Sequence, residues 1–132
     1  MDAFQQQIHI RFRQTDMAGI AYFNEAFNIF HDVYEAWVEH HFKDKSNWFA
    51  NSEWAVPLKN VSAEYQRPLL PFATYTVRMQ LHEVGKSSFQ LHTEILSTEG
   101  VHAKITTTHV FMNKATRRGQ EIPNDIRRIL EM

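Results

Sequence analysis

The sequence predicts an α+β fold in which a five-stranded antiparallel sheet wraps around one long helix. A strand-like alternation near the N-terminus precedes an aromatic stripe with helical spacing, and four strand-like segments then follow with only short breaks between them. Short breaks favour antiparallel neighbours. The helix therefore has one antiparallel sheet against which it can bury its apolar side.

The first strand is expected where Ile8, Ile10 and Phe12 alternate with polar side chains. A long helix should follow, beginning near Ile20. Its apolar positions recur every three or four residues, which is typical of the buried side of an amphipathic helix. These positions are Phe23, Ala26, Phe27, Phe30, Val33, Tyr34, Trp37 and Val38. We interpret the stripe as core.

The segment 43–53 is polar around Trp48 and Phe49, so we expect a loop with an aromatic tip there. Four strands are expected after it. Their approximate bounds are 55–66, 74–84, 87–97 and 101–113. In the last strand the apolar phase changes near residues 107–110, which indicates a β-bulge. Pro123 should open a short helix that ends with Leu130.

The composition is that of one ordinary globular domain over residues 1–132, with 43% hydrophobic and 22% charged residues. A net charge of -1 argues against nucleic acid or a membrane as partner, because both favour an extended basic surface. The chain has no cysteine, which excludes disulfides and a thiol nucleophile. Its polar start and its lack of a long apolar run predict a cytoplasmic protein. The eight histidines follow no ligand spacing, so no metal is expected.

The strongest candidate site comes just before the long helix, where an isolated acid, Asp16, is followed by Gly19. The first N–H groups of a helix have no partners within it and can polarise a bound carbonyl. Gly19 would let the backbone approach a ligand closely. An acid beside such a terminus favours acyl-transfer chemistry. The simpler interpretation is that Asp16 only caps the turn and Gly19 relieves strain, and the motif alone leaves both open.

The stretch TDMAGIAYFNEAF resembles the signature of hot dog fold acyl-CoA thioesterases of the 4-hydroxybenzoyl-CoA type. Asp16, Gly19, Tyr22 and Phe23 fall on its key positions. The continuation FHDVYEAW, which contains His31, is similar to the 1,4-dihydroxy-2-naphthoyl-CoA thioesterase branch. Weaker matches follow in order as YQRP, GKSS and IPNDIRRIL. The resemblance implies a hot dog fold, an acyl-CoA substrate and no cofactor, since coenzyme A is part of the substrate.

The resemblance also implies roles for single residues. Asp16 would attack the thioester carbonyl or activate water as a general base, and the N–H of Phe23 or of a residue near Gly19 would polarise the carbonyl oxygen. Tyr22 would contact the substrate. His31 would contact a ring substituent of the acyl group, unless it is an ordinary core histidine.

The phosphates of coenzyme A need hydrogen-bond donors, and the GKSS segment offers a tight, positively charged turn. Lys86 with Gly85, Ser87 and Ser88 is the first candidate, although an ordinary hairpin turn would look the same. Arg67 is the second candidate. Two other functions stay open: a hot dog dehydratase or hydratase, for which no catalytic histidine motif is evident, and a non-catalytic acyl-CoA binding or assembly module.

We expect a homodimer that could pair further into a homotetramer. One sheet covers only one side of the aromatic helix, and an edge strand with the apolar phase of residues 101–105 would invite a second copy. The family resemblance implies that Asp16 of one subunit faces the GKSS turn and the loop before Pro57 of the other.

Overall fold

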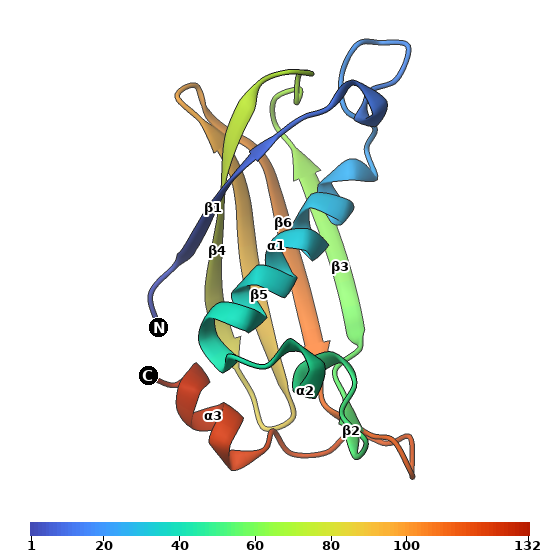
Figure 1. The fold of residues 1–132 in the computed structure, drawn as a ribbon, viewed down its shortest axis with the longest axis vertical. Helices are drawn as coiled ribbons and strands as arrows, with labels where there is room; N and C mark the ends of the chain where they lie inside the picture. Colours follow the sequence, from blue (N-terminus) through green and yellow to red (C-terminus); the bar gives the residue numbers. More distant parts are fainter.

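The computed structural model describes residues 1–132 and places one long helix, α1, across a five-stranded antiparallel sheet (Figure 1). The sheet order is β1-β4-β5-β6-β3. Its strands are β1 (Phe4–His9), β3 (Leu58–Tyr65), β4 (Thr74–Val84), β5 (Ser88–Ser97) and β6 (Gly100–Val110). The predicted α+β architecture is therefore confirmed.

Helix α1 (Glu25–Phe42) begins five residues later than the predicted start near Ile20. The residues before it form a compact turn whose backbone groups bond to one another: the Gly19 N–H donates to the Asp16 carbonyl and the Asp16 N–H donates to the Ile20 carbonyl, both at 3.0 Å. The helix ends at Phe42 because Lys43 takes a left-handed φ of 66°.

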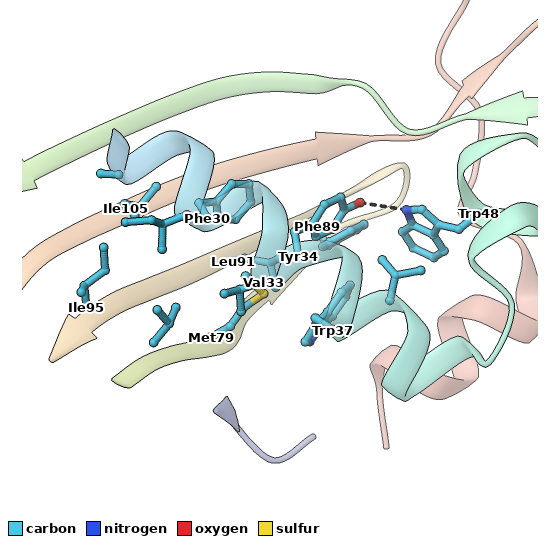
Figure 2. Close-up of a cluster of buried hydrophobic side chains, with 14 of the residues drawn as sticks. Phe30, Val33, Tyr34, Trp37, Trp48, Met79, Phe89, Leu91, Ile95 and Ile105 are labelled. Atoms are coloured by element: carbon cyan, nitrogen blue, oxygen red, sulfur yellow. Dashed lines mark hydrogen bonds between the residues drawn. The ribbon is translucent and has the colours of Figure 1, made fainter. Parts of the chain in front are cut away.

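The aromatic stripe of α1 forms the core with the inner face of the sheet (Figure 2). The buried helix positions are Ala26, Ile29, Phe30, Val33, Tyr34, Trp37 and Val38. Burying one large apolar side chain of this kind contributes about 1.5–3 kcal/mol. Phe23 departs from the prediction, since it precedes the helix and is 73% exposed. Phe27 is only half-buried.

A second helix, α2 (Lys45–Phe49), replaces the predicted loop with an aromatic tip. The Asp44 carboxylate caps it by accepting the Asn47 N–H at 3.0 Å. Trp48 is buried and its indole N–H donates to the Tyr34 hydroxyl at 2.8 Å (Figure 2). Phe49 stays partly exposed at the surface. The segment therefore extends the core around the C-terminal half of α1.

Strand β6 keeps one unbroken alternation from Ala103 onwards, with Thr107 and His109 buried, so the predicted change of phase there is wrong. The Thr107 hydroxyl lies 2.8 Å from His109 Nε2, so the two buried side chains satisfy each other in part, whereas His109 Nδ1 has no partner in the chain. The sheet carries its extra residues elsewhere: in β3 between Leu58 and Asn60, in β4 between Leu81 and Glu83, and in β6 at His102.

The edges of the sheet are β1 and β3. The prediction that residues 101–105 lie on an exposed edge is wrong, because β6 lies between β5 and β3. All of β3 except the half-buried Ala63 is exposed.

The remaining elements are a small sheet and a helix. The small sheet pairs β2 (Trp54–Ala55) with β7 (Met112–Asn113). The helix α3 (Asn124–Leu130) is preceded by Pro123, as predicted. None of the helices combines the length and apolar character needed to cross a membrane.

Candidate active site

The turn that contains Asp16 borders a cleft of about 570 Å³. Asp16 Oδ1 accepts the Ala18 N–H at 2.8 Å, so the carboxylate does cap its own turn. Its second oxygen, Oδ2, accepts no hydrogen bond from the chain. The half-buried Asp16 therefore retains one carboxylate oxygen for a ligand while the other stabilises the turn.

Gly19 has a left-handed φ of 77°, which disfavours any residue with a Cβ. A Cβ at this position would meet no atom within 4 Å in this chain. The backbone conformation of the Asp16 turn therefore accounts for a glycine at this position, and the close approach of the backbone to a ligand stays a prediction.

The cleft brings together two segments that are far apart in the sequence. Its lining residues are Asp16, Ile20, Ala21, Phe23, Tyr65, Gln66, Arg67, Pro68 and Leu69. The Ala21 N–H donates to the Leu69 carbonyl at 2.9 Å and joins the two walls. The cleft thus combines a carboxylate and a guanidinium group with mainly apolar walls, as an acyl-binding site requires.

Free backbone donors lie next to this cleft. The N–H groups of Phe23 and Asn24 donate to no acceptor in the chain, whereas the Tyr22 N–H donates to the Gln14 carbonyl at 2.9 Å. Phe23 therefore presents a free N–H as predicted, although it precedes α1 instead of lying in its first turn. Tyr22 is half-exposed and does not line the cleft.

Gln14 holds this arrangement together and was missed by the sequence analysis. It is 7% exposed, its Oε1 accepts the Arg11 N–H at 2.7 Å, and its Nε2 donates to Glu25 Oε2 at 3.1 Å. These bonds tie the end of the first strand to the start of α1. A lone glutamine before a Thr-Asp pair gives no sequence signal of that role.

The GKSS turn joins β4 to β5 at the opposite end of the sheet from the Asp16 turn (Figure 1). The Gly85 N–H donates to the Ser88 carbonyl at 2.7 Å, and the Ser87 carbonyl accepts the Phe111 N–H at 2.8 Å. The Lys86 side chain is 80% exposed and its Nζ lies 3.4 Å from Glu121 Oε1. Hydrogen bonds therefore hold the backbone of the turn while the Lys86 side chain stays accessible, but one chain does not bring the turn to Asp16.

The structure also places the other two predicted site residues, His31 and Arg67. The side chain of His31 is 52% exposed and not partly buried in an acyl pocket, and its Nδ1 lies 4.0 Å from Glu35 Oε1. Arg67 is exposed and lines the Asp16 cleft, and its contact with a CoA phosphate stays a prediction. No three histidine or acidic side chains lie close enough to hold a metal ion.

Comparison with known proteins places this geometry in a family. The model of the Thioesterase-like superfamily matches residues 10–130. A 1,4-dihydroxy-2-naphthoyl-CoA hydrolase from Nostoc punctiforme is 30% identical over 122 residues, which are 92% of this chain and 82% of that protein. The protein of the same name from Acaryochloris marina is 26% identical, and the matched region covers 89% of this chain and 88% of that protein.

Solved structures agree on the fold. A 1,4-dihydroxy-2-naphthoyl-CoA thioesterase from Synechocystis superposes with a TM-score of 0.89 at 22% identity, over 98% of this chain and 96% of its own. A Staphylococcus aureus protein in complex with CoA superposes with a TM-score of 0.85 at 15% identity, over 98% and 82% of the two chains.

The fold and these matches define a thioester hydrolase of the hot dog fold. The chain belongs to the Thioesterase-like superfamily. The family resemblance and the hot dog fold predicted from the sequence are confirmed.

Proposed function

We propose that the chain hydrolyses acyl-CoA thioesters with an aromatic or polycyclic acyl group and releases a carboxylic acid and free CoA. The observation that carries the proposal is the free oxygen of Asp16 in an apolar cleft that also includes Phe23, whose N–H has no partner. The relatives named as 1,4-dihydroxy-2-naphthoyl-CoA hydrolases support a bicyclic aromatic acyl group.

Asp16 supplies the reacting carboxylate and the Phe23 N–H stabilises the negative charge that develops on the carbonyl oxygen. In one route Asp16 Oδ2 bonds to the acyl carbon, CoA thiolate leaves, and water hydrolyses the resulting anhydride. In the other route Asp16 takes a proton from water as the water attacks the acyl carbon, and the C–S bond then breaks to release CoA thiolate. Release of CoA ahead of the acid in a single turnover would support the first route.

The test of the substrate class is a thiol-release assay with benzoyl, naphthoyl, phenylacetyl and straight-chain CoA thioesters. We expect the highest kcat/KM for the bicyclic aromatic ester. A preference for straight chains would contradict the acyl class. Saturable binding of every ester with turnover of none would instead support the non-catalytic acyl-CoA binding module.

The CoA half of the substrate would bind at the GKSS turn, through Lys86 and the groups of Gly85, Ser87 and Ser88. The active unit would then be a homodimer, because the GKSS turn and the turn that contains Asp16 lie at opposite ends of one sheet (Figure 1). The exposed edge strand β3 offers a surface for the second copy, since its backbone groups on that edge face no neighbouring strand.

Two measurements test this shared site. Light scattering should give at least twice the chain mass of 15.6 kDa. Mixing Asp16→Ala chains with Lys86→Glu chains should restore part of the activity, because some mixed dimers regain one intact site. A fully active monomer, or no complementation in demonstrably mixed dimers, would contradict the shared site.

A further inference from the structure

His102 is a buried side chain for which the proposed reaction has no use. It is 3% exposed and occupies the extra residue of β6, where Ile95 pairs with Ala103 but Leu96 pairs with Val101. A β-bulge of this kind re-aims a side chain. As a result, both His102 and its neighbour Ala103 are buried, although adjacent residues of a regular strand point to opposite faces.

Both the backbone and the ring of His102 bind the segment that lines the Asp16 cleft. The His102 carbonyl accepts the N–H groups of Gln66 and Arg67 at 2.8 and 3.1 Å. Its ring Nδ1 lies 3.0 Å from the Pro68 carbonyl oxygen. One residue therefore holds three consecutive residues of the cleft wall.

The hydrogen bond to Pro68 places a proton on one ring nitrogen of His102. A carbonyl oxygen can only accept a hydrogen bond, so His102 Nδ1 is protonated and donates to the Pro68 carbonyl oxygen. His102 Nε2 lies 2.6 Å from Ser97 Oγ, and Ser97 Oγ accepts the Glu99 N–H at 3.1 Å. These hydrogen bonds connect the turn between β5 and β6, through the His102 ring, to the cleft wall.

The wall is joined to the Asp16 turn directly after Pro68. The Leu69 carbonyl accepts the Ala21 N–H at 2.9 Å, and Ala21 also bridges to Thr15 beside the acid. Tyr75, whose ring meets His102 edge-on at 4.8 Å, accepts the Leu70 N–H at 2.8 Å. Displacement of His102 would therefore be transmitted to both walls of the cleft.

We infer that His102 is a positioning residue for the thioesterase site: oriented by Ser97, its imidazole fixes the Pro68–Leu69 wall against the Asp16 turn. The inference rests on the proposed function for its effect on catalysis, but not for its effect on the cleft. His102 forms no hydrogen bond with Asp16 and would act only through the wall.

Three variants test the ring in the full chain. His102→Phe keeps an aromatic ring without donor or acceptor, His102→Asn can still donate from the Nδ1 position, and Ser97→Ala removes the group that orients the ring. We expect His102→Phe to lower kcat about tenfold to a hundredfold, because small misplacement of reacting groups is costly. KM for the CoA thioester should change less, since the proposed CoA contacts come from the GKSS turn and not from the Pro68–Leu69 wall. His102→Asn should recover much of kcat.

The matched control is His109→Phe, which changes another fully buried histidine of the same strand that does not contact the cleft wall. Amide hydrogen exchange in the ligand-free protein gives a readout that needs no activity. His102→Phe should speed exchange at Ala21 and Leu70 about tenfold or more, whereas His109→Phe should leave both unchanged.

Each outcome decides the inference. Faster exchange at Ala21 and Leu70 together with a loss of kcat that His102→Asn recovers would support it. Unchanged exchange, an unchanged kcat, or an equal loss of kcat in His109→Phe would overturn it. If the wild-type chain hydrolyses no thioester, the proposed function fails, and the exchange data alone still decide whether His102 organises the cleft. If His102→Phe does not fold, Ser97→Ala replaces it: faster exchange at Ala21 and Leu70 with a lower kcat would support the inference, and no change in either would overturn it.

Discussion

Arg127 of α3 donates from Nη2 to two backbone carbonyls of the GKSS turn, those of Gly85 at 2.8 Å and of Lys86 at 2.9 Å. Its Nη1 lies 3.0 Å from Glu131 Oε1 on the same helix. The C-terminal helix therefore holds the proposed CoA-binding turn in shape. The sequence indicated the turn and the helix separately but not the bond between them.

Replacing Arg127 should weaken both the fold and the binding of CoA. Hydrogen bonds from a charged donor contribute about 1.5–3 kcal/mol, so Arg127→Met should lower the free energy of unfolding by about that amount. KM for the CoA thioester should rise because the turn loses its support. Denaturant unfolding and steady-state kinetics measure the two effects. The control, Glu131→Gln, breaks only a partly exposed ion pair and should change neither quantity appreciably.

Lys86→Ala should raise KM for the CoA thioester more than it lowers kcat, because the ammonium would contact a phosphate remote from the reacting bond. Added salt should reduce the difference from wild type, since it screens the same charge. Glu121→Gln, which frees Lys86 from its ion pair, should lower KM or leave it unchanged. An unchanged KM for Lys86→Ala at low salt would remove Lys86 from the site.

Tyr34→Phe should destabilise the protein, because it leaves the buried indole N–H of Trp48 without its acceptor. An unsatisfied buried donor costs about 1–3 kcal/mol. Burial raises the pKa of Tyr34, so its hydroxyl stays neutral across the working pH range. The free energy of unfolding measures the effect, with Tyr22→Phe as an exposed control that should change little. Equal values for the two variants would show that the bond contributes nothing.

Acid should destabilise the protein through His109. Burial, and secondarily the charge of His31, lowers the pKa of His109 from 6.5 to about 3. Between these pH values His109 binds a proton in the unfolded chain but not in the folded chain, so stability is lost as the pH falls from about 6.5 towards 3. The slope is on the order of 1.4 kcal/mol per pH unit.

His109→Phe should remove that contribution. Its free energy of unfolding, measured by urea titration at several pH values, should fall less steeply with acid than that of the wild type. Parallel curves for the two proteins below pH 6.5 would show that His109 does not titrate on unfolding.

The sequence predicted the sheet and α1 well because their apolar periods are long and regular. It misplaced the start of α1 because Ile20 and Phe23 continue the helical spacing, whereas the structure uses them to line the cleft. It missed α2 because a single buried tryptophan in a polar segment forms no repeating pattern of apolar positions.

Part of the site could be predicted for a similar reason. Asp16 and Gly19 are local signals of a turn, and the structure uses both in that way. His102 gave no such signal, because its bulge and its bond to Pro68 depend on pairing between segments distant in the sequence. The change of phase near residues 107–110 was predicted because Thr107 and His109 are polar residues at positions that face the core, and an alternation pattern cannot show the hydrogen bond between them.

The most direct test of the central claim separates the two roles of Asp16. Asp16→Asn keeps an oxygen that can accept the Ala18 N–H and cap the turn, but it loses the reactive carboxylate. We expect kcat for the preferred CoA thioester to fall about a thousandfold, on the order of 4 kcal/mol of barrier, with the unfolding midpoint and ligand binding largely unchanged. An Asp16→Asn protein that retains a tenth of the wild-type kcat would contradict a catalytic Asp16 and leave the residue as a turn cap.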